Sequence, residues 1–334
     1  MKKLQIRKET LEGIFISISQ EQKNRRRIKK IGRIAVGLFR GIFLFSLCLI
    51  LLYPLLIMLS ISLRNPSELY DPTVIWIPKT FTIDAFRKAW QYLNFSEALS
   101  QTAFITVIGT ACQLLACTLA GYGFARFRFP LKKLLFGLLI FSIIVPTQII
   151  AIPSMVYFQR FDFFGFGSLV GIFTGTPLTV PIYNTMWSYF LPALFGAGIK
   201  AGLFVFIFIQ FFRGLPYELQ DAAYIDGCGR FQTFIRIMLP LSGSAILTVI
   251  LFSLVWYWND SLLGSLYFDK LRTLSVVLQN VRFELDAAHN NRDAAIVIPQ
   301  TYAAALMSIL PLTVLYAILQ KYFTESIERT GIVG

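Results

Sequence analysis

The sequence is poor in the residues from which metal sites and disulfide frameworks are built. Its 334 positions hold one histidine, four cysteines and only 18 acidic residues against 31 basic ones. The cysteines are scattered, so neither a disulfide pattern nor a metal-ligand spacing is present, and we expect no metal. His289 lies in a polar stretch and is expected on the solvated surface. The cysteines are Cys48, Cys112, Cys117 and Cys228.

The sequence also lacks a site for ATP and a set of groups for catalysis. It has no Gly-x4-Gly-Lys-Ser/Thr pattern, and therefore no loop to cradle phosphates and no expected cofactor of its own. Ionisable residues are nearly absent from the middle of the apolar runs. Intramembrane enzymes and proton- or sodium-coupled carriers usually need such residues, so both classes are disfavoured, although a self-sufficient secondary carrier stays open as an alternative. A driving force for transport must then come from a partner.

Apolar residues are abundant instead. They make up 56% of the chain, the mean hydropathy is +0.64, and several separate runs approach twenty residues, which indicates an integral membrane protein. The net charge of +13 does not indicate nucleic-acid binding, because twelve of the 31 basic residues lie in the first 40 positions, beside the first apolar run. We therefore predict a basic cytoplasmic N-terminal tail at 1–33. It lies on anionic lipid or, alternatively, contacts a specific protein.

The apolar runs predict an all-α protein of the cell membrane with six transmembrane helices and both termini in the cytoplasm. Proline interrupts the third run at Pro146 and Pro153, with Thr147 and Gln148 between them. Such a break suits a helix that lines a pore, and a plain kink is the alternative. Residues 159–193 are expected outside or partly re-entrant. Within a domain at 34–334, the expected spans are 34–61, 99–125, 134–158, 194–212, 241–258 and 294–319.

A polar island separates the fourth and fifth apolar runs, within the loop 213–240. Glu218 and Asp221 put negative charge near a helix start, and Asp226-Gly227 is a stop signal because glycine tolerates a left-handed cap. A second helix is expected to follow, with Phe231, Phe234, Ile235 and Met238 on one face. The loop therefore reads as two short helices at a membrane surface.

The spacing in this island resembles a family motif. Inner-membrane subunits of binding-protein-dependent ABC importers carry a cytoplasmic motif written EAA-x3-G-x9-I-x-L-P. Here Asp221-Ala222-Ala223 is followed at the same spacings by Gly227, Ile237 and Leu239-Pro240, with aspartate in place of the first glutamate. In that family the loop holds the coupling helix, which docks into a groove on the ATPase subunit. The resemblance thus implies a type I importer transmembrane domain and a coupling loop at 213–240.

Two further stretches are similar to the maltose-type members of this family. One is 120–130, with its Y-x-F-A-R-x-R-F pattern, and the other is Trp256-Tyr-Trp258-Asn259-Asp260. Tryptophans at a span end are usually interfacial, while stacking on a sugar face is the alternative. Trp256, Trp258 and Asn259 therefore join the candidate pathway residues. Family tails often end G-x-V-K-G, and here 331–334 keeps the glycines without the lysine.

The resemblance implies a non-catalytic permease subunit of a carbohydrate importer, with an oligosaccharide as the expected cargo. Glycerol phosphate or a polyol is the alternative cargo. The implied partners are a second homologous permease subunit, two ATPase subunits that bind the ATP, and an extracytoplasmic binding protein. No nucleic acid is expected.

Overall fold

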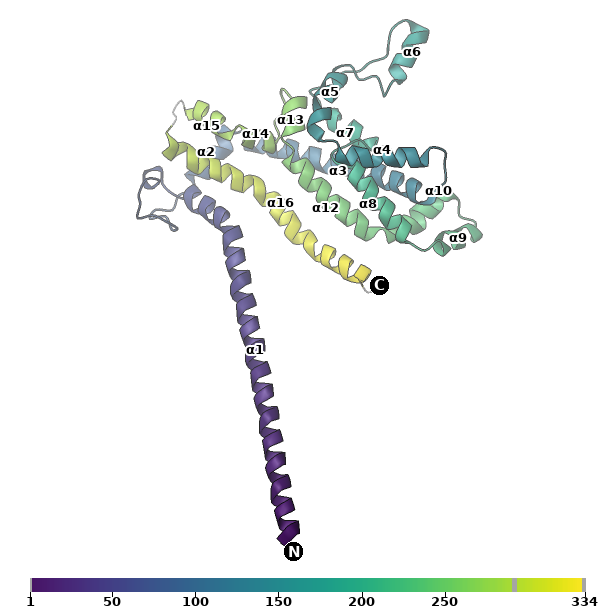
Figure 1. Ribbon diagram of the computed structural model, residues 1–334. Coiled ribbons are helices and arrows are strands. Elements are labelled where there is room, and N and C mark those ends of the chain that lie inside the picture. The colour runs from purple at the N-terminus through teal and green to yellow at the C-terminus, as the bar shows by residue number, and fades with distance from the viewer. Residues whose placement is uncertain (1, 290–292, 332–334) are drawn as a thin grey trace. The chain divides into compact units, whose positions relative to one another are not determined.

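The computed structural model describes residues 2–289 and 293–331, and in these residues the chain is helical without a regular strand (Figure 1). It divides into two units, 1–60 and 61–334. The helices are α1 (Lys2–Ser62), η1 (Pro66–Glu68), α2 (Asp84–Tyr92), α3 (Phe95–Arg126), α4 (Lys132–Ile144), α5 (Thr147–Gln159), α6 (Phe166–Thr174), α7 (Trp187–Leu194), α8 (Ala201–Gly214), α9 (Glu218–Ile225), α10 (Arg230–Thr233), the π-helix η2 (Phe234–Met238), α11 (Leu239–Leu241), α12 (Gly243–Asn259), α13 (Leu262–Tyr267), α14 (Leu274–Gln279), α15 (Val281–His289) and α16 (Ala294–Gly331).

The first unit is most of the single helix α1. Its part at Gly32–Ser62 is apolar enough to cross a membrane, with a mean hydropathy of 2.8 over its best window. At 31 residues this part is about 46 Å long, more than the roughly 30 Å hydrocarbon layer requires. The helix continues through Pro54.

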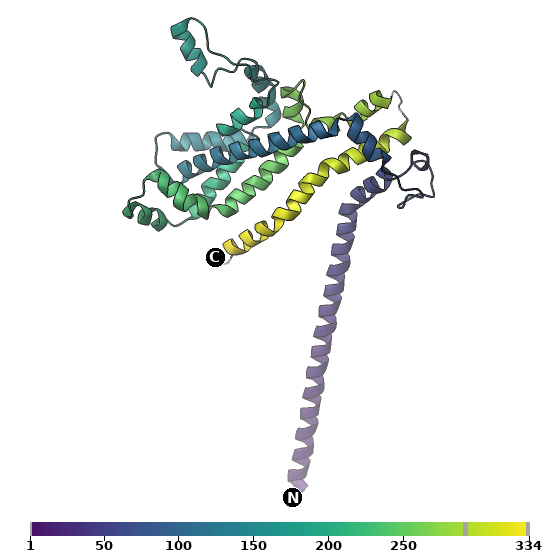
Figure 2. The same ribbon diagram turned by 180° about the vertical axis from the view of Figure 1, so that it is seen from behind.

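Three helices form the packed centre of the second unit. Helices α3, α8 and α12 pack on one another and run side by side in opposite views (Figure 1, Figure 2). The phenylalanines Phe204, Phe208 and Phe212 of α8 are fully buried in this core. A Cβ on Gly121 of α3 would lie only 2.3 Å from the Phe208 Cβ atom, so glycine allows α3 and α8 to approach this closely.

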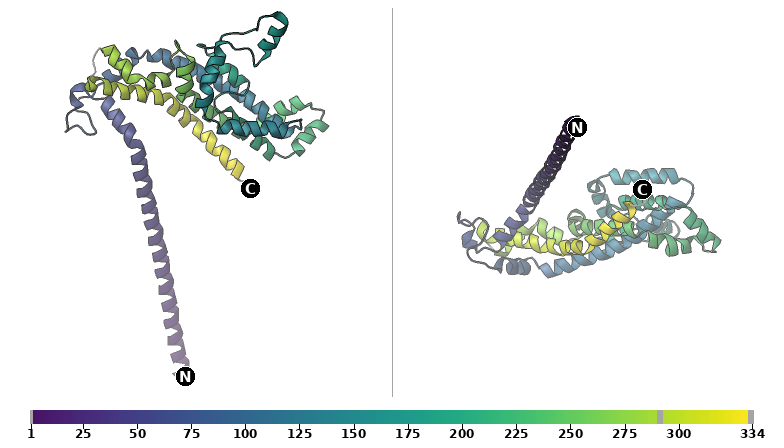
Figure 3. Two further views of the ribbon diagram at one scale, coloured as in Figure 1. Left: turned by 45° about the horizontal axis from the view of Figure 1, so that its top comes forward. Right: turned by 90° about the horizontal axis from the view of Figure 1, so that it is seen from below.

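A second core joins the start of α3 to α2, α14, α15 and α16, and α16 also packs along α12 (Figure 3). His289 belongs to this region and is not the solvated side chain that was expected. It is half-buried, its Nε2 atom lies 2.8 Å from Gln300 Oε1, and its ring meets that of Tyr92 at 4.7 Å. The expectation placed on the tail 331–334 falls, apart from Gly331, outside the described residues.

The membrane helices are less regular than the apolar runs suggest. Among the described residues, only α1, α3 and α16 each hold a segment that is long and apolar enough to cross a membrane, and up to six spans result when three bent helix pairs are counted as one span each. The interruption expected in the span 134–158 is present at Pro146, where α4 and α5 meet at 103° across the break at Val145-Pro146. The expected start of the fourth span at 194 is wrong: α7 ends there and α8 begins at Ala201.

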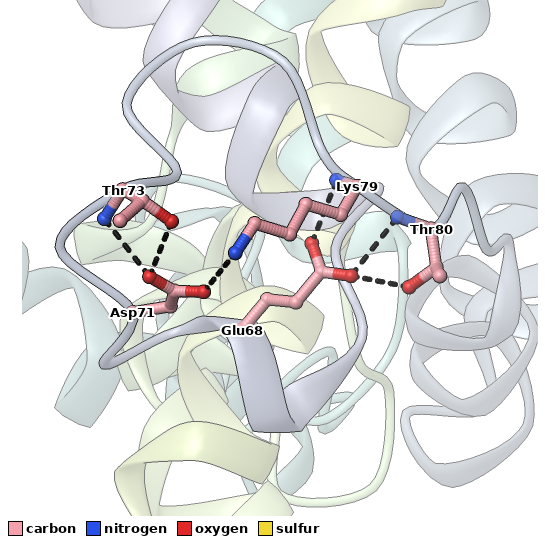
Figure 4. Close-up of polar contacts among 5 residues, drawn as sticks. All are labelled: Glu68, Asp71, Thr73, Lys79 and Thr80. Carbon is pink, nitrogen blue, oxygen red and sulfur yellow. Dashed lines mark hydrogen bonds and ion pairs between the residues drawn. The ribbon is translucent and has the colours of Figure 1, made fainter.

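The segment between α1 and α2 is a loop organised by Glu68. The buried carboxylate accepts the backbone N–H groups of Lys79 at 3.0 Å and Thr80 at 2.9 Å, and the Thr80 hydroxyl also donates to it (Figure 4). Asp71 pairs with the Lys79 ammonium and accepts from Thr73. These hydrogen bonds hold the pKa of Glu68 below its usual range, the one from Thr80 being the largest cause. Two carboxylates thus fix the fold of a loop with few backbone ladder bonds.

Candidate functional site: the coupling loop and a cavity at the far ends of α8 and α12

The coupling loop, residues 213–240, lies across the ends of two membrane helices. Helix α9 is bent by 75° from α8, and the segment Arg230–Leu241 is bent by 75° from α12. Leu215 and Pro216 end α8, and Ser242 separates α11 from α12. The loop has two arms: the first is α9, and the second is the segment Arg230–Leu241. Both arms therefore run crosswise to the helices that carry them, as two short helices at a membrane surface would.

Gly227 makes the turn between the two arms. Gly227 adopts a left-handed φ of +80°, and its N–H donates to the Tyr224 carbonyl at 3.1 Å. The N–H of the next residue, Cys228, donates to the Ala223 carbonyl at 2.9 Å. This is the Schellman arrangement that satisfies the last carbonyls of a helix. The left-handed cap expected at Gly227 is confirmed. No atom lies within 4 Å of the position that a Cβ would take, so only the backbone conformation demands glycine.

The acidic and alanine positions of the motif divide between surface and core. Glu218, Asp221, Ala222 and Asp226 are exposed, whereas Ala223 is 2% exposed and faces inward. The two carboxylates in the first turn of α9 lie at the positive end of its dipole, where they stabilise the helix. The exposed side of α9 thus carries acidic side chains, and the small side chain of Ala223 faces inward.

The second arm does not form the single apolar face that its spacing predicts. Phe234 and Met238 are buried, but Phe231 and Ile235 are 67% and 44% exposed. The spacing was read with a period of 3.6, and η2 is wound with the wider period of a π-helix. Phe231 and Ile235 therefore lie on a different side of the arm from Phe234 and Met238.

Proline explains this change of winding. Pro240 has no N–H for the Arg236 carbonyl, and its ring would collide with that carbonyl in an α-helix. The Leu239 N–H instead reaches back five residues to the Phe234 carbonyl. Leu239 packs against the α3–α8–α12 core and Ile237 is half-buried. The motif's second half therefore anchors the arm, while its first half forms surface and turn.

Two apolar side chains beside the glycine turn are exposed. Ile225, which was not singled out from the sequence, is 86% exposed, and Phe231, which was expected on the apolar face of the second helix, is 67% exposed. They lie two residues before and four residues after Gly227, and this position beside the motif's glycine was their signal in the sequence.

A cavity of about 610 Å³ lies beside the α4–α5 break, between α4, α5, α7, α8, α12 and α13. Its lining combines aliphatic side chains and glycines with aromatic rings and hydroxyl groups, and Lys200 is the charged side chain among the described residues that line it. The rings and hydroxyls include Tyr157, Tyr189, Tyr257, Tyr267, Trp256, Ser142, Thr147, Ser154 and Ser188.

The structure brings together only part of the candidate pathway set. Thr147 and Trp256 line the cavity, and Pro146 stands at the break that shapes it. Trp258 points to the other side of α12, where its Nε1 donates to Ser308 of α16 at 3.1 Å. Gln148 and Asn259 are exposed and do not line the cavity. Adjacent positions on a helix face different ways, so one motif cannot place Trp256 and Trp258 in the same site.

A buried amide supports the cavity wall and was also missed. Gln113 of α3 is fully buried, donates to the Ile199 carbonyl at 2.8 Å and accepts from the Tyr257 hydroxyl at 2.8 Å. It ties α3 to α12 and to the turn before α8. An amide in the middle of the span 99–125 was the signal, since such groups usually bond across helices.

Comparison with known proteins agrees with this geometry. Residues 113–329 match the family described as binding-protein-dependent transport system inner membrane component. Protein LplC of Bacillus subtilis is 29% identical over 88% of this chain and 93% of its own length. The arabinooligosaccharides transport system permease protein AraQ of Halalkalibacterium halodurans is 28% identical over 85% and 92%.

A solved structure has the same fold. A bacterial ABC transporter chain involved in import of the acidic polysaccharide alginate superposes with a TM-score of 0.66 at 19% identity, over 86% of this chain and 96% of that one. The matched region contains the whole coupling loop and every residue of α8 and α12. This chain therefore belongs to the family of binding-protein-dependent transport system inner-membrane components.

Proposed function

We propose that this chain is one permease subunit of an ATP-driven importer and forms half of the pathway for a carbohydrate, most simply an oligosaccharide. The observation that carries the proposal is the coupling loop. Its motif is folded as two short helices around a left-handed glycine turn, with Ile225 and Phe231 exposed beside that turn. Such a surface is suited to a groove on a partner protein.

The partners follow from what the sequence lacks. With no phosphate-cradling loop, the chain needs ATP hydrolysis by another subunit, and it carries no cofactor itself. We assign to the complex a second, homologous permease subunit, two ATPase subunits and an extracytoplasmic binding protein. Closure of the ATPase pair on ATP would draw the two coupling loops together and open the membrane helices outward.

The cargo is proposed from the names of relatives and the chemistry of the cavity. AraQ and a melibiose/raffinose/stachyose import permease protein of Bacillus subtilis, the latter 29% identical over 84% of this chain, are named for oligosaccharides. Aromatic rings suit the apolar faces of sugars, and hydroxyls suit their polar edges. We assign Thr147 and Trp256 to the pathway, together with Tyr157 and Tyr257, and give Pro146 the role of shaping it.

The orientation is proposed from charge. The basic residues near 1–33 and 126–133 belong on the cytoplasmic side by the positive-inside rule, and the coupling loop joins them there. This places both termini in the cytoplasm and the Glu68 loop outside.

The test is ATP hydrolysis by the reconstituted complex. Asp221→Lys reverses a charge at the positive end of α9 on its exposed side, so the complex should assemble but lose binding-protein-stimulated hydrolysis and uptake. Asp286→Lys, a charge reversal on α15 at the opposite end of the second unit, serves as the control and should behave as the wild type. Robust hydrolysis by this chain alone, or full stimulation in the Asp221→Lys complex, would contradict the proposal.

A further inference from the structure

The start of the coupling helix is held by one residue from a distant part of the chain. Arg126, the last residue of α3, donates from Nη2 to the Leu215 carbonyl at 2.7 Å, and its guanidinium lies 4.4 Å from the ring centre of Tyr217. Leu215 ends α8, and Tyr217 immediately precedes α9. Arg126 thus spans the joint between membrane helix and coupling helix from the side of a third helix.

This arginine is poorly placed to stabilise the protein. It is 8% exposed, and its Nε and Nη1 atoms are buried without a hydrogen-bond acceptor among the described residues. The ion pairs of the described residues do not include it. A buried cation with unpaired donors weakens a fold, and an apolar side chain of similar size is commonly tolerated or better there. The interactions that the guanidinium does make, with the Leu215 carbonyl and the Tyr217 ring, both lie at the joint before α9.

The neighbouring side chains continue the same connection. Tyr122, one turn before Arg126, packs its ring against Phe212 of α8 at 5.5 Å and against Phe234 of the second arm at 4.9 Å. The end of α3 therefore touches both arms of the coupling loop. Tyr122 makes these contacts through an apolar ring surface, whereas Arg126 makes a directional hydrogen bond at the joint itself.

We infer that Arg126 is a positioning residue for coupling: it fixes the start of α9 to the end of α3, so that displacement of the coupling helix moves α3. The inference rests on the proposed function of the loop. Helix α3 also carries Gln113, which bonds to Tyr257 in the cavity wall. Movement passed to α3 thus reaches the cavity through a rigid helix and a buried hydrogen bond.

The experiment compares variants in the complete complex with its ATPase subunits and binding protein, in nanodiscs. Arg126→Met keeps an apolar stem of similar length and removes the guanidinium, so assembly and basal hydrolysis should stay normal. Stimulation by the binding protein should fall by at least about fivefold, the lower end of common coupling factors. Arg126→Lys should restore it only in part, because an ammonium lacks the planar fork. Arg128→Met, an exposed cation two residues on, is the matched control and should change nothing.

A distance measurement separates coupling from mere folding. Spin labels at Pro130 and Leu219, both exposed, report the α3 end and α9. Their distance should stay narrow and unchanged between nucleotide-free and ATP-trapped complexes, and should broaden in Arg126→Met. If this variant does not assemble, Tyr217→Leu should produce the same broadening, and its absence overturns the inference.

The outcomes also distinguish a failure of the Arg126 inference from a failure of the proposed coupling function of the loop. If Arg126→Met keeps full stimulation while Gly227→Leu loses it, the loop couples but Arg126 does not hold it. If both keep full stimulation, the coupling loop itself is wrongly assigned.

Discussion

Gly227 is required for its backbone and not for lack of space. Its φ of +80° costs a residue with a Cβ about 1 kcal/mol, and no neighbour would clash. We therefore expect graded effects on binding-protein-stimulated ATP hydrolysis per assembled complex. Gly227→Asn, which tolerates the left-handed region, should retain most of the activity, and Gly227→Val should lose it. Gly229→Ala is the control, since Gly229 has an ordinary φ of −71° and open surroundings. Equal activity of the asparagine and valine variants would show that the left-handed backbone at Gly227 is not needed for stimulated ATP hydrolysis.

Glu68 makes the outer loop sensitive to acid. Because hydrogen bonds lower its folded pKa below the ordinary 4.5, the stability that it contributes is fully present above about pH 4.5 and is lost as the pH falls through the folded value. Exchange of the Lys79 and Thr80 amide hydrogens, measured by mass spectrometry, should be slow at pH 6 and disproportionately faster at strongly acidic pH after correction for intrinsic rates.

Glu68→Gln should already show fast exchange at pH 6, since one acceptor oxygen becomes a donor facing an N–H or hydroxyl donor. Asp84→Asn, on the exposed start of α2, is a suitable control and should leave the two amides protected. Protection of Lys79 and Thr80 that persists in Glu68→Gln would show that the carboxylate does not organise the loop.

At the scale of single elements, sequence reasoning succeeded where the signal is local and failed where remote packing decides. The glycine turn and the two short helices follow from Asp226-Gly227 and the flanking charges. The angle of the α4–α5 break does not, because Pro146 in an apolar run is compatible with a small kink as well as with a 103° bend. The angle is fixed by contacts from elsewhere, such as Gly202 of α8, where a Cβ would lie 2.4 Å from the Ser142 hydroxyl.

The same limit applies to the candidate site. Spacing identified the motif residues, yet Ile225 and Gln113 were missed. Phe231 was placed on an apolar face, and Arg126 was noted only as part of the stretch 120–130. The contacts of Gln113 and Arg126 are with helices distant in sequence. Trp258 was included among the candidate pathway residues because it lies near Trp256 in the sequence. Residues two apart on a helix face different ways, and Trp258 faces α16. A short motif at a helix end cannot specify which of its side chains faces a cavity.

Gly198 tests the packing of the cavity wall. A Cβ there would lie 2.4 Å from Gln113 Oε1 and 2.8 Å from the Tyr257 hydroxyl, so Gly198→Ala should displace this hydrogen bond. We expect a loss of about 1–3 kcal/mol, measured as a lower unfolding temperature in detergent. In a Gln113→Ala background the same substitution should cost less, because the nearest obstacle is gone. Additive losses would mean that the two residues do not share this contact.

At the scale of the whole molecule, the charge distribution predicts the side of the membrane on which each loop lies. In a cysteine-free background, impermeant reagents on intact cells should label Ile75→Cys and Phe283→Cys but not Asp226→Cys, all at exposed positions. Permeabilised cells should label all three, which controls for reactivity. Labelling of Asp226→Cys alone in intact cells would reverse the proposed orientation.

The π-helix before Pro240 has a consequence for where a proline can stand. A π turn holds one residue more than an α turn, so η2 acts as a one-residue insertion written into the geometry. Each residue of an α-helix corresponds to a rotation of about 100°. Five residues wound as a π-helix sweep almost the same angle as four residues wound as an α-helix. Deleting one residue from 234–238 would therefore let the turn close as an α-helix without turning the residues that follow, but the Pro240 ring would then meet the carbonyl four residues back. The surplus residue is thus what allows a proline to stand inside this arm.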